Sequence, residues 1–129
     1  MKKVVSLIII IIGFFSVILL VSSVDKIRDE LAARKPQKIR MVVLNGTSID
    51  DLAAETADFL QKNGCDILQI GNATSPHKKT VILDRSNGDL KKARRIRHLL
   101  GVGEMAYEPD PTHIVGVTVI LGEDYKPEQ

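Results

Sequence analysis

The feature that most constrains this chain is an uncharged stretch near its N-terminus. Residues 4–24 read VVSLIIIIIGFFSVILLVSSV. A helix rises about 1.5 Å per residue, so this stretch would span about 31 Å, close to the ~30 Å hydrocarbon core of a bilayer. Inside lipid, a helix satisfies the backbone N–H and C=O groups of a spanning segment. We therefore predict a membrane anchor over residues 1–25.

Two other interpretations of the stretch stay open. In a cleaved secretory signal, Lys2 and Lys3 would form the positive end, and the small residues of Val21-Ser22-Ser23 would precede the cleavage point. In a soluble protein, the stretch would be a buried helix. The apolar region of a cleaved signal usually has about 7–15 residues, and this run is longer, which favours an uncleaved anchor.

Charge does not settle which side of the membrane the rest of the chain faces. Lys2 and Lys3 flank one end of the stretch, and a larger basic group follows the other end: Lys26, Arg28, Arg34, Lys35 and Lys38. Counted simply, the positive-inside rule places the C-terminal part in the cytoplasm. Long domains can nevertheless cross regardless of nearby charge, so the orientation stays open at this point.

Beyond the anchor, the chain has room for one small domain. Residues 26–38 are charged and rich in helix-forming residues, and Pro36 marks their end, so we expect a juxtamembrane helical linker. The domain would occupy residues 39–125, followed by a tail over 126–129. Cys65 is the single cysteine and the three His residues are widely separated, so the sequence predicts no disulfide, metal or cofactor site.

Short β-branched runs and amphipathic runs succeed one another in this domain. Strands are expected at residues 39–44, 65–71, 80–85 and 115–121, with a short edge strand at 102–107, and helices at 49–63 and 90–100. Ser48 and Asp51 have the spacing of a capping box for the first helix, and Asp89 is the expected N-cap of the second. The buried stripe of the first helix is predicted to contain Ile49, Leu52, Ala53, Thr56, Phe59 and Leu60.

The order of these elements predicts a two-layer α/β domain. A strand–helix–strand unit places its two strands in parallel. Two helices with one apolar stripe each would cover one face of a mixed sheet. The two halves share the order strand, turn, helix, strand, although their sequences differ too much to indicate a repeat.

Two groups of polar residues are candidate binding sites. Asn45, Gly46 and Thr47 precede the first helix, where backbone N–H groups can bind an anion, although a turn with a helix cap would use the same residues. The second helix carries basic residues away from its apolar stripe: Lys91, Lys92, Arg94, Arg95 and His98. Such a face can bind an anionic polymer, a lipid head group or an acidic protein, or it can simply be solvated.

The sequence does not predict an enzyme. Its candidate catalytic side chains fall on different elements: Asp84, His77, His98 and His113. Nucleic acid is not an expected partner either, because no stacking aromatic residue accompanies the basic helix.

The run VVLNGTSIDDLAAETADFLQKNGCDILQIGNA, over residues 42–73, resembles the C-terminal domain of LytR-type cell-envelope proteins. That family shows a strand ending in V-L-N-G-T/S, a helix with L-A and A-x-x-L, a Gly, a short strand and G-N-A. Its later features are a strand, an A-x-x-L-A/L-x-x-L-G helix and a closing V-T-V-x-L-G-x-D-[FY], which match residues 81–84, 93–101 and 117–125 here. The chain departs from the family at Ser48 and Ile49, where Gly is frequent, and at Cys65, where a larger apolar residue is common.

The resemblance implies a bacterial envelope protein with a single-pass anchor in the cytoplasmic membrane and its domain outside the cytoplasm. In many relatives this domain follows a phosphotransferase domain that attaches glycopolymers to the wall. Here it follows the apolar stretch directly, so the ligase activity is not carried over. We expect a non-catalytic module that binds peptidoglycan or an anionic wall glycopolymer, with an adaptor domain for an envelope protein as the alternative.

Overall fold

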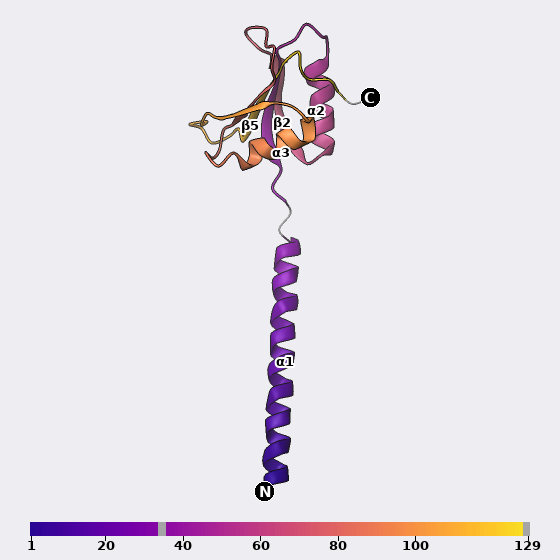
Figure 1. The fold of residues 1–129 in the computed structure, drawn as a ribbon, viewed down its shortest axis with the longest axis vertical. Helices are drawn as coiled ribbons and strands as arrows, with labels where there is room; N and C mark the ends of the chain where they lie inside the picture. Colours follow the sequence, from indigo (N-terminus) through magenta and orange to yellow (C-terminus); the bar gives the residue numbers. More distant parts are fainter. Residues whose placement is uncertain (34–35, 128–129) are drawn as a thin grey trace. The chain divides into compact units, whose positions relative to one another are not determined.

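The chain has two parts, which we describe separately. The computed structural model describes residues 1–33 and 36–127. Its internal contacts divide the chain into Met1–Gln37 and Lys38–Gln129. The first part is a helix, α1, from Lys2 to Ala33, and the second is a small domain of strands and two helices (Figure 1).

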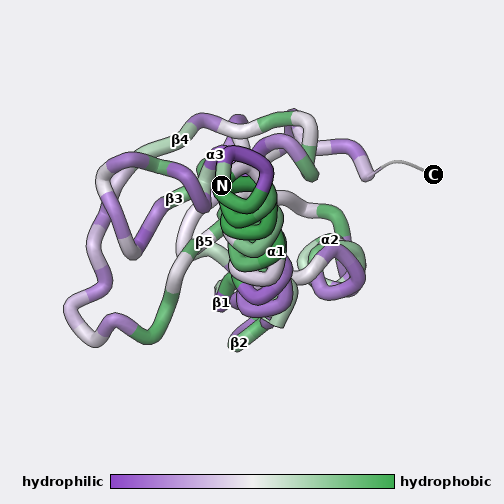
Figure 2. Tube along the Cα trace, turned by 90° about the horizontal axis from the view of Figure 1, so that it is seen from below, coloured by the Kyte–Doolittle hydropathy of each residue, from purple (hydrophilic) through white to green (hydrophobic). Residues whose placement is uncertain are grey.

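Helix α1 is long and apolar enough to span a membrane. It has 32 residues, about 48 Å at 1.5 Å per residue, and its most apolar window has a mean hydropathy of 3.3. Figure 2 shows the apolar colouring that extends along α1 and gives way to polar residues toward its C-terminal end. The helix continues through the charged residues 25–33. Arg34 and Lys35 of the predicted linker lie outside the described residues.

The domain is built on a five-stranded mixed sheet with the order β2-β1-β5-β3-β4. Its strands are β1 (Ile39–Asn45), β2 (Cys65–Asn72), β3 (Val81–Asp84), β4 (Glu104–Tyr107) and β5 (Val117–Leu121). Strand β1 is parallel to β2 and β5, and β3 is parallel to β4 but antiparallel to β5. With helices α2 (Leu52–Lys62) and α3 (Lys91–Leu100), the sheet therefore contains two strand–helix–strand units, one on each side of β5.

Both helices cover the same face of the sheet, and the predicted two-layer α/β fold is confirmed. Alternate residues of the central strands are buried there, such as Met41 and Val43 on β1 and Val119 on β5. They form one core with the apolar stripes of the helices, which include Leu60 of α2 and Ile96 of α3. The intervening residues of each strand point to the other face, because side chains alternate along a strand.

The domain has a core of its own. In the part of the chain that the structure describes, every buried residue lies within residues 39–125, and α1 has none. Since burial of apolar surface supplies most of the driving force for folding, residues 38–129 contain what the domain needs to fold without the anchor.

Helix α2 begins later than expected, and the predicted capping box is wrong. It starts at Leu52 after Asp51, whose backbone is left-handed (φ 59°) and whose side chain makes no capping hydrogen bond. The preceding residues are held in a turn instead, in which Asn45 Nδ2 donates to the Ile49 carbonyl (2.7 Å). Ile49 therefore lies outside the helix and is exposed.

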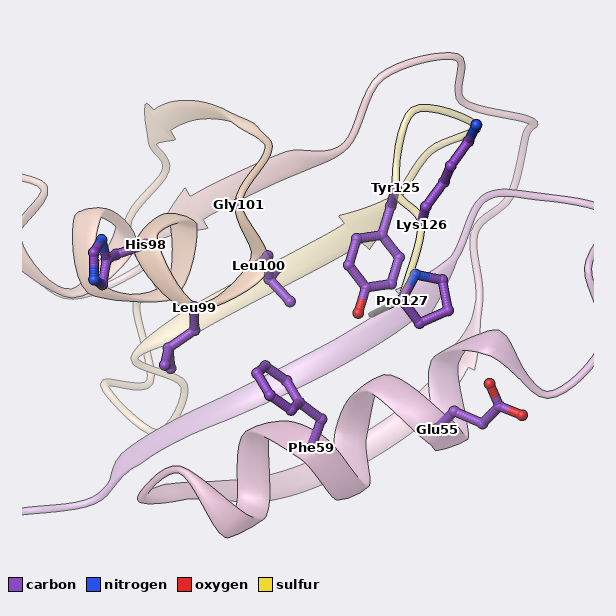
Figure 3. A pocket seen from close by; sticks show the side chains of 9 residues that line it. All are labelled: Glu55, Phe59, His98, Leu99, Leu100, Gly101, Tyr125, Lys126 and Pro127. Atoms are coloured by element: carbon purple, nitrogen blue, oxygen red, sulfur yellow. The ribbon is translucent and has the colours of Figure 1, made fainter. Parts of the chain in front are cut away.

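Phe59 is a second departure from the predicted core. The helical stripe is shifted so that Ala57 is buried, whereas Phe59 remains 41% exposed. This large aromatic side chain stands on the surface of α2, on the side that faces α3 (Figure 3).

Candidate functional site

Helix α3 presents a basic surface. Its ten residues include no acidic residue, and all of its basic side chains are exposed: Lys91, Lys92, Arg94, Arg95, Arg97 and His98. Ala93, Ile96 and Leu100 are buried against the sheet. The burial spacing thus places every cation of the helix on its solvent side, as the sequence predicted for five of them. Arg97 was not among the predicted site residues, although the same periodicity assigns it to the exposed face.

Nearby groups engage only some of these cations. Lys91 forms an ion pair with Asp89 (Nζ–Oδ2, 3.4 Å), and Arg95 donates to the Asn63 carbonyl at the end of α2 (3.5 Å). Within the described residues, Lys92, Arg94 and Arg97 form no ion pair. The surface therefore carries positive charge that the described part of the domain does not neutralise.

A buried carboxylate fixes the start of α3. Asp84, at the end of β3, is fully buried, and its Oδ2 accepts the N–H of Ala93, the third residue of the helix (3.2 Å). Its Oδ1 accepts the N–H and hydroxyl of Ser86 and the N–H of Asn87. Burial by itself would raise the pKa of Asp84, but the hydrogen bonds outweigh it, so the pKa lies below its usual value.

Asp84 thus has the helix-capping role that the sequence predicted for Asp89. Asp89 accepts the Lys91 N–H (3.1 Å), but the residue that precedes α3 is Leu90, which has left-handed backbone (φ 57°) and no side-chain capping bond. A negative charge at the N-terminus of a helix is favourable, because the helix dipole is positive there. Asp84 therefore positions α3, and with it the basic surface, against the end of β3.

A shallow cationic depression lies at the C-terminal end of α3. Arg94, Arg97, His98 and Gly101 line it, and its volume is about 300 Å³. Gly101 ends the helix in left-handed backbone (φ 74°) and donates its N–H to the Arg97 carbonyl (2.9 Å). Two guanidinium groups and an imidazole at one place provide donors suited to a phosphate or carboxylate.

A deeper cleft separates α3 from α2 (Figure 3). It has a volume of about 370 Å³ and is lined by Glu55, Phe59, His98, Leu99, Leu100, Gly101, Tyr125, Lys126 and Pro127. Phe59 rises from α2, while Tyr125 comes from the segment after β5 and directs its hydroxyl into the cleft. The cleft shares His98 and Gly101 with the cationic depression, so the two hollows are contiguous.

Three residues of the cleft have positions that the sequence did not predict. Phe59 was predicted to be core, and residues 126–129 were expected to form a tail that follows the domain. The structure instead brings Lys126 and Pro127 to the wall of the cleft, and Glu128 and Gln129 lie outside the described residues. This wall of the cleft depends on the path of the segment that follows β5. No local sequence pattern specifies that path.

The other predicted group, Asn45, Gly46 and Thr47, lies in a separate hollow at the ends of β1 and β2. Asn45 Oδ1 accepts both the N–H and the hydroxyl of Thr47, and Gly46 donates its N–H to the Leu121 carbonyl (2.9 Å). The trio thus makes a turn whose polar groups bond to one another and to β5. The structure does not bring it together with the basic surface, and a ligand there stays a prediction.

Cys65 belongs to the core. It is completely buried, and burial raises the pKa of its thiol despite the opposing charge of Arg95. No group of three His, Cys, Asp or Glu side chains within residues 1–33 and 36–127 is arranged to hold a metal ion.

Comparison with known families gives one match. The family model LytR_C, described as LytR cell envelope-related transcriptional attenuator, matches residues 38–125. The chain belongs to the LytR_C family. The match covers the whole sheet, both helices of the domain and Tyr125 of the cleft. No curated protein sequence and no solved structure gives a significant match to the chain.

The family and the anchor helix together fit a membrane-anchored cell-envelope module. LytR_C is a non-catalytic C-terminal domain family, and α1 supplies an apolar helix of membrane-spanning length. The basic surface of α3 lies within the matched residues, and so does the cleft apart from Lys126 and Pro127.

Proposed function

We propose that this LytR_C domain is a non-catalytic module that binds an anionic polymer of the cell envelope, such as peptidoglycan or a glycopolymer attached to it. Helix α1 would hold it in the cytoplasmic membrane as a single-pass anchor, with the domain outside the cytoplasm. The observation that carries the proposal is the exposed, acid-free basic surface of α3.

The cations of this surface that form no ion pair support binding to a polymer. Lys92, Arg94 and Arg97 have no acidic partner within the described residues, and Arg94 makes only a long hydrogen bond to the Asp89 carbonyl (3.4 Å), so their charges remain available to an anion. Contacts between exposed charges are weak one by one, about 0.2–1 kcal/mol each, and are screened by salt. A polymer with repeated negative charges engages several of them together and so gains affinity from their sum.

The proposal can be tested by sedimentation of residues 38–129 with purified peptidoglycan sacculi, with and without attached anionic polymer, at low and moderate salt. The test variant carries Lys92→Ala, Arg94→Ala and Arg97→Ala. A matched control carries Arg40→Ala, Lys62→Ala and Lys78→Ala, which removes three exposed charges located off α3.

We expect the wild-type domain and the control to sediment in a salt-sensitive way, and the α3 variant to bind about tenfold more weakly. Equal binding by the two variants would mean that net charge, not this surface, is responsible. No sedimentation of the wild-type domain under any condition would contradict the proposal.

The alternative function is that of an adaptor for an envelope protein. The exposed Phe59 beside the basic surface favours it as a second candidate, because protein interfaces depend on a few aromatic and Arg residues. An adaptor would be captured by crosslinking in membranes and would lose its partner through one substitution, whereas polymer binding should decline in steps as charges are removed.

A further inference from the structure

The cleft and the cationic depression adjoin at His98 and Gly101, and we call the two hollows together the groove, which has two chemically different halves. One half has the exposed Phe59 ring on its α2 wall and Tyr125 and Pro127 on another wall. The other half carries Arg94 and Arg97. His98 and Gly101 belong to both halves, so a ligand that extends past them contacts an apolar surface and a cationic one at once.

We propose that this groove binds a single sugar-phosphate unit, with the pyranose ring against Phe59 and the phosphate against Arg94, Arg97 and His98. This inference rests on the proposed function, since it names the unit of the anionic polymer that the α3 surface would recognise.

The exposed aromatic ring is the first support. Phe59 is 41% exposed, although it belongs to a helix whose neighbouring Leu60 is completely buried. An aromatic ring has a flat apolar face on which the C–H groups of a sugar ring can pack. Its position in a cleft of about 370 Å³ makes it an available wall, and this volume falls in the range of about 300–1,000 Å³ for small-molecule sites.

The hydroxyl of Tyr125 is the second support. The Tyr125 side chain is only 5% exposed, and its hydroxyl is directed into the cleft. This hydroxyl can both donate and accept a hydrogen bond, so it gives the cleft a polar group beside the apolar ring of Phe59. Glu55 and Lys126 on the rim supply a further acceptor and donor. Together they provide the mixed partners that a sugar's hydroxyl groups require.

The net positive charge of the groove favours a ligand with an anionic group. Among the described residues that line the groove, Glu55 is the single acidic one, against Arg94, Arg97 and Lys126. Arg guanidinium groups bind phosphate in a bidentate way. A neutral sugar would leave the cationic half unused, and an acidic peptide would leave the cleft wall at Phe59 without a matching flat surface.

The test uses the folded domain, residues 38–129, and NMR titrations with four probes: glucose 1-phosphate, glucose, inorganic phosphate and a tetraglutamate peptide. We expect glucose 1-phosphate to shift resonances of Phe59 and Tyr125 together with those of His98, and to bind at least about fivefold more tightly than phosphate. Phosphate alone should shift only the cationic half. Phe59→Ala should reduce glucose 1-phosphate binding to the level of phosphate, whereas Ile70→Ala, which removes an exposed apolar side chain outside the groove, should not.

The inference is overturned if glucose 1-phosphate binds no more tightly than phosphate, if Phe59→Ala leaves its affinity unchanged, or if tetraglutamate binds as tightly and shifts the same resonances. Binding of phosphate without any gain from the sugar defeats this inference alone and leaves the proposed function standing. Absence of any shift with phosphate, combined with no sedimentation on sacculi, defeats both.

Discussion

Replacing the buried carboxylate Asp84 by its neutral isostere should be among the more destabilising single changes in this domain. Asp84→Asn keeps the shape of the side chain but removes its charge. Oδ1 can still accept the three hydrogen bonds from Ser86 and Asn87. The amide NH₂ group that replaces Oδ2 would instead face the N–H of Ala93, which now donates at 3.2 Å.

The size of the effect follows from these contacts. Loss of a hydrogen bond to a charged group costs about 1.5–3 kcal/mol, and neutralising the acceptor weakens each of the three remaining bonds by roughly 0.5 kcal/mol. We therefore expect the free energy of unfolding to fall by about 3–4.5 kcal/mol. A domain of this size has a total of roughly 5–14 kcal/mol, so the change is a large share of its stability.

The cost should depend on pH in a defined direction. The pKa of Asp84 is lowered in the folded domain, so its contribution is fully present above the unfolded-state pKa of about 3.9 and is lost as the pH falls through the folded-state pKa. Urea unfolding of residues 38–129 followed by circular dichroism at pH 7 should show a midpoint about 2–3 M lower for the variant. The difference from the wild-type domain should shrink steadily below pH 4.

Asp89→Asn is the matched control. Asp89 is exposed and makes a hydrogen bond and an ion pair with Lys91, so its replacement should cost less than about 1 kcal/mol. The reasoning fails if Asp84→Asn costs as little as the control at pH 7. It also fails if the cost is the same at pH 3 as at pH 7, since the charge would then contribute nothing.

Three further predictions follow from close contacts and burial. Gly46→Ala should lower the melting temperature by about 10 °C or more, because the added Cβ would lie 2.6 Å from the Leu121 carbonyl oxygen, whereas Gly88→Ala, with its nearest contact at 3.7 Å, should be tolerated. Leu60→Ala should cost about 2–5 kcal/mol in urea unfolding and Phe59→Ala clearly less, and equal costs would contradict the exposed position of Phe59. Asp110→Asn should accelerate hydrogen exchange at the amides that donate to that carboxylate, and because those bonds lower the pKa of Asp110, protection of the same amides in the wild-type domain should be retained above pH 4 and lost only in strong acid.

Most strands and helices could be predicted from local patterns. The β-branched runs form β1, β2, β3 and β5 of the sheet. Side chains alternate between the two faces of any strand, and β1 shows this alternation in its burial. The glycines that end α2 and α3, Gly64 and Gly101, have left-handed backbone as their sequence positions indicated. These features depend on residues close in the sequence, and no distant contact overrides them.

The start of α2 and the support of α3 could not be predicted in this way. Asn45 and Thr47 prefer to bond to each other, and this turn uses the residues that would otherwise have extended and capped the helix. At α3, the capping carboxylate comes from Asp84, which lies nine residues before its partner Ala93. Capping rules that consider only the helix and the residues just before it predict Asp89 instead. They contain no information about which strand end lies against the helix.

By itself, the sequence determined that the chain has an apolar helix of membrane-spanning length, a two-layer α/β domain and a basic helix, since each follows from composition and periodicity along a continuous segment. Only the tertiary structure decided that Phe59 is exposed, that Tyr125 and Lys126 line a cleft, and that the cleft joins the cations of α3. The physical reason is that a groove is defined by the spacing of elements far apart in the chain. That spacing depends on how α2, α3 and the segment after β5 pack on one sheet, and hydrophobic period alone does not fix it.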